Sequence, residues 1–300
     1  MTIVEQKDWT RGGLHFRDVT ITVPFDHFGR SREAASASVN LPDTLSVFAR
    51  IIATEADSRK PYLVYLQGGP GVEAPRPGIV GGPGGWVKRA LEEFQVVMLD
   101  QRGTGKSSPI GSVDGAITGL DTVGADPAAI AEALSYFRAD SIVEDAEILR
   151  GHLGADTWSL LGQSFGGFTT LRYISAHSSA LNEVFFTGGL PAIGLDPATV
   201  YGRTWEGMIR KSEQYYTAFP GDREKMRRLV ELASVGEGLA LPGGARATPE
   251  RIRLLGHFLG SSDGPEKLHY LLDHDFGSSA FRHVLAASLP FSGRNPLYAV

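Results

Sequence analysis

The sequence predicts a doubly wound α/β fold followed by a mainly helical second unit. Short apolar runs that stop at glycine are typical of parallel strands buried on both faces, and helical patterns lie between these runs. After residue 190 the strand patterns stop, and four helical patterns follow, separated by glycine and proline. We therefore expect an α/β core over residues 1–189 and a helical unit over residues 190–300.

Antiparallel strands are predicted within residues 1–60. Residues 14–23 alternate between apolar and polar side chains, and residues 46–53 form a second β-rich run. The polar stretch 26–38 between them is predicted to be a loop. The sheet that carries the chemistry is expected over residues 61–189.

Four short apolar runs predict the buried parallel strands, at residues 62–66, 94–99, 158–161 and 184–186. A helix is predicted from Ser141, which has the spacing of a capping box with Glu144. In the second unit, helical patterns cover residues 199–217, 222–234, 249–259 and 264–272.

The composition excludes several classes of protein. The 300 residues are 42% hydrophobic and 21% charged, which is near the average for folded domains and excludes disordered chains. A net charge of −5 with no dense Lys/Arg block argues against a nucleic-acid partner. The absence of cysteine excludes disulfides and a thiol nucleophile. Residues 1–12 are polar and no apolar run approaches a membrane span, so we expect a soluble cytoplasmic protein without a membrane partner.

The strongest chemical motif is Gly162-Gln-Ser164-Phe-Gly166, which follows a predicted strand and precedes a predicted helix. A serine on such a sharp turn has a cramped backbone, so the residues two positions away on either side must lack a Cβ. Its hydroxyl is exposed at the end of the sheet, beside free N–H groups of the helix N-terminus. A chance match is the alternative, but the strand–turn–helix context favours a nucleophile at Ser164.

A second glycine-rich turn, Gln67-Gly68-Gly69-Pro-Gly71, ends an earlier predicted strand. An oxyanion hole needs a second N–H donor from another loop, and hydrolases with a serine elbow take it from the turn after the third strand. A merely flexible turn is the alternative. Together with the elbow, the position of this turn favours the oxyanion donor.

The segment 100–107, DQRGTGKS, is similar to a phosphate-binding loop but lacks its spacing, because Asp100 stands where the first glycine is required. We predict a structural turn in which Asp100 and Arg102 hold neighbouring loops. The eight histidines show no metal-binding spacing. No metal and no cofactor is therefore expected.

The sequence resembles the proline iminopeptidases (prolyl aminopeptidases) of the α/β-hydrolase fold, in their longer-chain bacterial subgroup. Six stretches spread over most of the chain carry the resemblance: LQGGPG at 66–71, DQRGTGKS at 100–107, GQSFGG at 162–167, TGGLP at 187–191, LHYLL at 268–272 and NPLYA at 295–299. It implies a serine aminopeptidase that releases an N-terminal residue, preferably proline, from short peptides through an acyl-enzyme. A general esterase or amidase, or a non-catalytic remnant, is the alternative.

The resemblance also implies roles for individual residues. Ser164 is implied to be the nucleophile, and the N–H groups of Gly69 and Phe165 the oxyanion hole. The glycines that support the elbow and the loop are Gly162, Gly166 and Gly68. The helical segment after residue 190 is implied to be a cap over the substrate's N-terminal residue. Many relatives carry His in place of Gln67, and the backbone role there is expected to survive.

The acid and the base of a serine triad are not evident in the chain. In this fold they follow the nucleophile on loops after further core strands, but only one strand is predicted after Ser164. We therefore expect a C-terminally truncated chain, poorly soluble and inactive as it stands, whose acid and base lie beyond residue 300. The alternative is a local pair, either Asp263 with His274 or Asp275 with His283, although the fold mounts both groups on strand ends.

Overall fold

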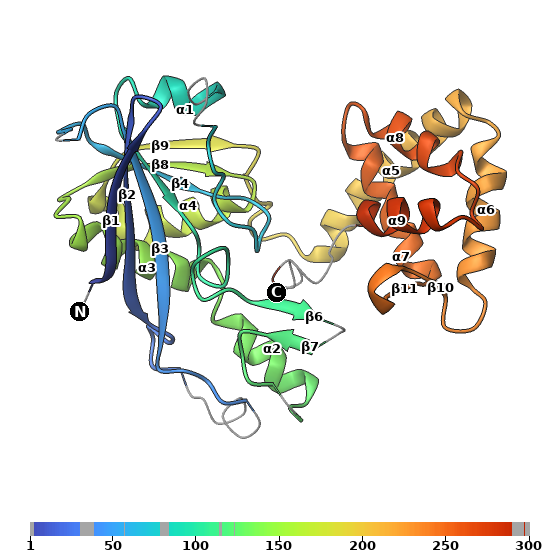
Figure 1. Cartoon of the computed structure of the whole chain (residues 1–300), viewed down its shortest axis with the longest axis horizontal. Helices are drawn as coiled ribbons and strands as arrows, with labels where there is room; N and C mark the ends of the chain where they lie inside the picture. The colour runs from blue at the N-terminus through green and yellow to red at the C-terminus, as the bar shows by residue number, and fades with distance from the viewer. Residues whose placement is uncertain are drawn as a thin grey trace. The chain divides into compact units, whose positions relative to one another are not determined.

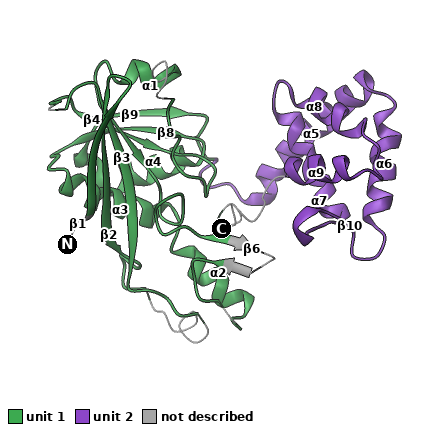
Figure 2. Ribbon diagram, in the orientation of Figure 1, with its two compact units in different colours: residues 1–191, 293–300 green, residues 192–292 purple. Residues whose placement is uncertain are grey.

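The computed structural model describes residues 3–30, 39–56, 58–78, 84–113, 116–122, 124–289 and 297 of the chain (Figure 1). The chain divides into two compact units (Figure 2). Unit 1 comprises residues 1–191 and 293–300, and unit 2 comprises residues 192–292. Leu297, which the prediction assigned to the helical unit, packs in the core of unit 1.

Unit 1 is built on a seven-stranded sheet in the order β1-β2-β3-β5-β4-β8-β9. The strands β1 (Ile3–Arg11), β2 (Leu14–Pro24) and β3 (Thr44–Ala53) are antiparallel, and β3 pairs antiparallel with β5. The other pairings, from β5 through β4 and β8 to β9, are parallel. These strands are β4 (Tyr62–Leu66), β5 (Gln95–Leu99), β8 (Trp158–Gln163) and β9 (Leu181–Thr187).

This sheet confirms the predicted α/β-hydrolase fold, with parallel strands at the four predicted apolar runs. Strand β1 was not predicted. It pairs with β2 alone and carries polar side chains such as Gln6 and Asp8, because an edge strand can face water. A two-stranded ribbon of β6 (Gly111–Val113) and β7 (Ala116–Thr118) lies outside the sheet.

Helices cover both faces of the sheet, as a doubly wound fold requires. Side chains of β4 and β5 alternate between two hydrophobic clusters. Leu63, Tyr65 and Met98 join the cluster that contains Val87 of α1 (Gly85–Ala90). The intervening residues join the cluster packed by α2 (Pro127–Ser135), α3 (Ala139–His152) and α4 (Phe165–His177).

The predicted start of α3 is wrong. Arg138 is the N-cap, and Ser141 lies inside the first turn with its hydroxyl buried and unpaired among the described residues. The carboxylate of Asp140 accepts the Ser141 N–H at 2.9 Å and also pairs with Arg30. An acidic side chain in the first turn stabilises the helix N-terminus, so α3 begins two residues before the predicted cap.

A polar contact fastens α4 to α3 behind the sheet. Tyr173 of α4 donates a hydrogen bond to Glu147 of α3 and accepts one from Trp158 Nε1 at 3.1 Å. Arg150 Nε and Nη2 donate hydrogen bonds to the two oxygens of the same carboxylate, at 2.9 and 2.6 Å. Because α4 starts directly after Ser164, this contact helps to fix the element that carries the candidate nucleophile.

Replacing Glu147 with glutamine is expected to destabilise unit 1 more at neutral pH than at acid pH. Burial alone would raise the pKa of Glu147, but its hydrogen bonds with Arg150 and Tyr173 outweigh burial and hold the pKa below its usual range. Such a carboxyl contributes stability above its unfolded pKa of about 4.3, and loses it as the pH falls through the folded pKa. Urea unfolding at neutral pH and below about pH 3 checks this prediction. An equal loss of stability at both pH values would contradict it.

Unit 2 is helical, with α5 (Pro197–Ala218), α6 (Asp222–Ala233), α7 (Pro249–Arg253), α8 (Gly264–Leu272) and α9 (Ser279–Ser288) around one core. Of the four predicted helices, the one over 249–259 is divided into α7 and a 3₁₀ segment, Leu254–Gly260. Helix α9 was missed, although Ser278 caps it by accepting the Phe281 N–H at 3.1 Å. A short hairpin of β10 (Leu239–Ala240) and β11 (Arg246–Ala247) completes the unit.

Candidate active site

The serine elbow is strained. Ser164, between β8 and α4, has φ 53° and ψ −119°, in a region that residues other than glycine rarely adopt. Two backbone hydrogen bonds hold this conformation: the Ser164 N–H donates to Thr187 O of β9, and the Gly167 N–H donates to Ser164 O, both at 2.9 Å. The Ser164 side chain is exposed. Strain of this kind, held in place by its surroundings, is typical of functional positions.

Close backbone contacts explain the glycines of the motif. A Cβ on Gly166 would lie 1.8 Å from the carbonyl oxygen of Leu66, and one on Gly162 would lie 2.3 Å from Thr170 Oγ1. A Cβ on Gly68 would lie 2.8 Å from Ser164 Cβ. The turn after β4 therefore rests directly against the elbow after β8, as the two motifs together predicted.

Two backbone donors are free beside the serine. Among the described residues, neither the Gly69 N–H nor the Phe165 N–H donates to a protein acceptor. Phe165 opens α4, whose N-terminus carries partial positive charge. Gly69 has φ +126°, a conformation that favours glycine.

The positions of Ser164 and Gly69 relative to the sheet are also typical of a ligand-binding site. Strand β4 lies between β5 and β8, so the chain order of the strands reverses beside β4. Ligands of open α/β sheets bind at the carboxyl ends of the strands where the order reverses. Ser164 and Gly69 follow the carboxyl ends of β8 and β4.

The segment after β5 holds the loops around the site, and the predicted role of Asp100 is confirmed. Its buried carboxylate accepts the N–H groups of Ala74 and Lys106, at 3.1 and 3.0 Å, and binds Arg76 at 2.5 Å. Gln101 Nε2 donates to Gln67 O at 3.0 Å. The turn that contains Gly69 is therefore anchored from β5.

Arg102 is buried, and its guanidinium is satisfied within the protein. It donates to both carboxylate oxygens of Asp145, at 2.7 and 2.6 Å, and to the carbonyls of Phe25, Tyr136 and Pro24. This confirms its predicted structural role and leaves the guanidinium no free face for a phosphate. The side chain of His27, in the segment after β2, is also mostly buried: it is 7% exposed, with Nε2 at 2.8 Å from Asp145.

No histidine of unit 1 lies at the elbow. His177 ends α4, about 20 Å of helix away from Ser164, and contacts Glu144 at 3.0 Å. His152 ends α3, before β8 begins. His15 lies on β2 beside Thr10, where β2 and β3 run past the amino end of β5. His27 is held by Asp145, as described above.

In unit 2, the two acid–histidine pairs considered from the sequence do not form among the described residues. Asp263 pairs with Lys267 at 2.7 Å, and Asp275 accepts the Gly277 N–H at 3.0 Å. A different pair forms: His269 Nδ1 lies 2.8 Å from Asp222, which is buried and also accepts the Tyr215 hydroxyl at 2.6 Å. No local spacing in the sequence indicates this pair, because its members lie 47 residues apart on α6 and α8.

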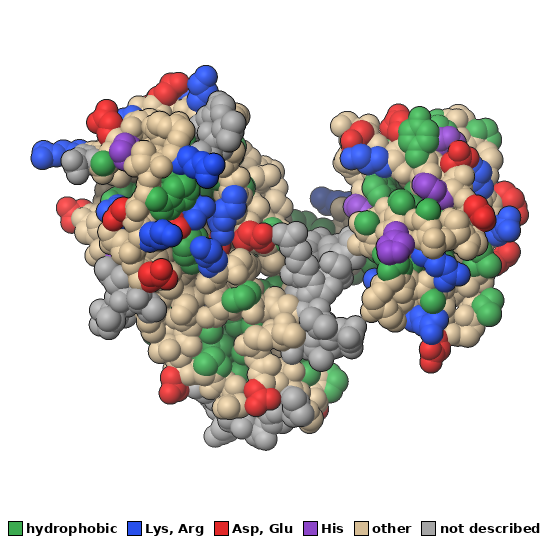
Figure 3. All heavy atoms as spheres, viewed as in Figure 1, with side chains coloured by type: hydrophobic (Ala, Val, Ile, Leu, Met, Phe, Trp, Pro, Cys, Tyr) green, Lys and Arg blue, Asp and Glu red, His purple; other side chains and the backbone are tan. Residues whose placement is uncertain are grey.

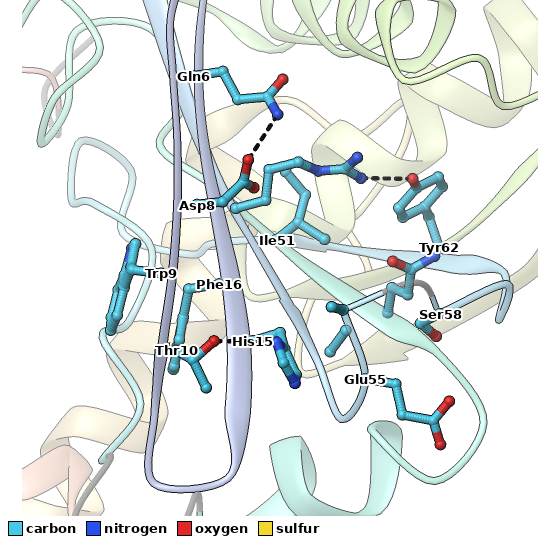
Figure 4. A pocket seen from close by; sticks show the side chains of 14 residues that line it. Gln6, Asp8, Trp9, Thr10, His15, Phe16, Ile51, Glu55, Ser58 and Tyr62 are labelled. Atoms are coloured by element: carbon cyan, nitrogen blue, oxygen red, sulfur yellow. Dashed lines mark hydrogen bonds between the residues drawn. The ribbon is translucent and has the colours of Figure 1, made fainter.

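Unit 1 also has two surface features outside the candidate site. A groove of about 670 Å³ is lined by residues of β1, β2 and β3 and by the first residues of β4 and β5, and in it Arg17 donates to the Tyr62 hydroxyl at 2.8 Å (Figure 4). Lys and Arg side chains also gather on the face of unit 1 seen in Figure 3.

Among the residues that the structure describes, no group of three or more acidic or histidine side chains could hold a metal ion. No helix among them is long and apolar enough to cross a membrane.

Comparison with known proteins gives consistent matches. Residues 61–234 match the family model described as the alpha/beta hydrolase fold. A proline iminopeptidase of Aeromonas sobria is 40% identical over 295 residues, which are 96% of this chain and 64% of that protein. A proline iminopeptidase of Aspergillus aculeatus is 34% identical over 257 residues, covering 82% of this chain and 55% of that protein. The chain thus spans less than two thirds of the length of either relative.

Proposed function

Because this chain belongs to the α/β-hydrolase fold family, we propose that it is a serine aminopeptidase that releases an N-terminal residue, preferably proline, from short peptides. One observation carries the proposal: the strained, exposed Ser164 lies beside two backbone donors that have no protein acceptor among the described residues. The similarity to the Aeromonas sobria proline iminopeptidase supports the preference for proline.

In the proposed reaction, Ser164 Oγ attacks the carbonyl carbon of the substrate's first residue. The carbonyl oxygen becomes an oxyanion that accepts hydrogen bonds from the Gly69 and Phe165 N–H groups. When the C–N bond breaks, the leaving amine takes the proton that a general base has removed from Oγ. Water then hydrolyses the ester, which releases the amino acid and restores Ser164.

The general base and the acid that orients it remain predictions, and we expect both residues to lie beyond residue 300. The test compares proline-arylamide hydrolysis by the chain ending at Val300 with hydrolysis by a form that includes any coding sequence after codon 300. We expect practical turnover only in the second form, because an unassisted serine hydroxyl is a poor nucleophile. Turnover by the first form that is abolished by His269→Gln would instead place the base in unit 2.

Unit 2 is proposed to act as a cap that covers the substrate's N-terminal residue, as the resemblance implies. The substrate test compares arylamides of proline and of other amino acids with simple esters. A clear preference for the proline arylamide supports the aminopeptidase. Equal activity on all arylamides, with faster ester hydrolysis, would favour a general esterase or amidase.

Replacing Gly69 with valine is expected to lower turnover by about 10²–10³, the usual loss when one oxyanion donor is removed. The valine is strained at φ +126°, and its Cβ lies 3.0 Å from Val72 Cγ2, so the turn has to shift. The matched control is Gly154→Val, which introduces similar strain at φ +66° in open space after α3. The control should lose stability and keep turnover. Near-normal turnover in Gly69→Val would show that the second donor lies elsewhere.

A further inference from the structure

One hydroxyl bridges the two turns of the candidate site. Tyr65, on β4, is buried and stacks on Trp86 of α1 with ring centroids 4.8 Å apart. Its hydroxyl lies 2.9 Å from Gln67 Oε1, just before the oxyanion turn. The same hydroxyl contacts the carboxamide of Gln163, the residue before Ser164.

The partners of Gln67 fix the orientation of its carboxamide. Its Oε1 accepts the Gly68 N–H at 3.0 Å, and its Nε2 donates to Glu73 O at 3.3 Å. Turning the amide over would put an NH₂ group against the Gly68 N–H, where two donors would face each other. Gln67 therefore presents its oxygen to Tyr65.

The hydroxyl of Tyr65 has one proton and contacts two carboxamide oxygens, Gln67 Oε1 and Gln163 Oε1. Burial raises the pKa of Tyr65, so the hydroxyl keeps that proton at neutral pH. The hydroxyl therefore donates this proton to Gln67 Oε1 or to Gln163 Oε1, one at a time. In either case the hydroxyl lies between the carboxamides of Gln67 and Gln163, and Gln67 Oε1 also accepts the Gly68 N–H.

The sheet register places these groups together. Leu66 pairs with Gly162 and Tyr65 with Leu161 across β4 and β8. Successive side chains of a strand point to opposite faces, so the side chains of Tyr65, Gln67 and Gln163 lie on one face. Leu161 packs in the same cluster as Tyr65, on the side covered by α1.

We propose that Tyr65 is a positioning residue, whose hydroxyl holds the oxyanion turn against the nucleophile elbow. This inference rests on the proposed roles of Ser164 and Gly69. Small displacements of an oxyanion donor weaken its interaction with the developing charge. In this proposal the hydroxyl acts through Gln67 and Gln163 rather than on the reacting atoms.

The test measures kcat and KM for proline-arylamide hydrolysis by the form that turns over, together with the rate at which a fluorophosphonate labels Ser164. It compares Tyr65→Phe with Tyr62→Phe, a matched control on the same strand that also loses a hydrogen-bonded hydroxyl. We expect Tyr65→Phe to lower kcat and the labelling rate about tenfold, as one lost hydrogen bond predicts. We also expect its KM and unfolding temperature to stay close to those of Tyr62→Phe.

A second variant tests whether the effect of Tyr65→Phe arises from the lost contact between Tyr65 and Gln163. Gln163→Leu removes the other end of the bridge, and we expect the double variant with Tyr65→Phe to be no slower than the worse single variant. Additive losses, or a wild-type kcat in Tyr65→Phe, would overturn the positioning role. The proposed role of Ser164 as the nucleophile is tested separately. It is wrong if Ser164→Ala keeps its activity or if labelling occurs at another serine.

Discussion

Replacing Ser164 with alanine is expected to lower turnover by about 10⁶, the loss seen when the nucleophile of a serine hydrolase is removed. The hydroxyl is exposed and makes no hydrogen bond with a described residue, so the fold should remain. Hydrolysis of a proline arylamide by the form that turns over is the measurement. Retention of most activity by Ser164→Ala would end the assignment of Ser164 as the nucleophile.

Glycine at the same position separates strain from chemistry. At φ 53° an alanine keeps the backbone strain of the serine, whereas glycine adopts this region without a steric penalty. We expect Ser164→Gly to be inactive and more stable than the wild type by about 1 kcal/mol or more. Equal stability of the glycine and alanine variants would show that the elbow stores no strain.

Gly166→Ala is expected to have the largest effect on stability. Its Cβ would lie 1.8 Å from the Leu66 carbonyl oxygen, and a backbone atom of a central strand cannot move aside as a flexible side chain can. We expect a loss of about 3 kcal/mol or more in the free energy of unfolding. Activity should fall as well, because β4 leads directly into the proposed oxyanion turn.

The matched control for this variant is Gly151→Ala in helix α3. A Cβ there meets no atom within 4 Å, and alanine is favoured over glycine inside a helix by about 0.5–1 kcal/mol. The same substitution should therefore raise stability at residue 151 and lower it at residue 166. Urea unfolding of both variants is the measurement, and a similar effect at both sites would contradict the close contact at the elbow.

The sequence predicted those parts of the fold that depend on local pattern. The parallel strands were found because each apolar run stops at a turn that requires glycine, and Gly162 and Gly166 make close contacts that only glycine allows. Strand β1 was missed because its sequence is rich in polar residues and shows no regular pattern of apolar side chains. The start of α3 was misplaced because Ser141 has the capping spacing, but its hydroxyl is buried and unpaired among the described residues.

The candidate site was predictable only in part, because the sequence shows local patterns but not contacts between residues far apart in the chain. Ser164 and Gly69 lie in motifs whose spacing along the chain is fixed by one turn each. The bridge through Tyr65 depends on the register between β4 and β8, which no local pattern records. The pairs His27–Asp145 and Asp222–His269 join residues 118 and 47 positions apart, so the sequence showed no sign of them.

The most direct test of the account is to identify the serine that a fluorophosphonate modifies in the form that turns over. After tryptic digestion, the peptide of residues 151–172 contains Ser159 and Ser164, which fragmentation in a mass spectrometer distinguishes. Ser159 is buried within β8, whereas Ser164 is exposed. We expect one adduct, on Ser164, and none in Ser164→Ala. An adduct on a different serine, or undiminished labelling of Ser164→Ala, would contradict the account.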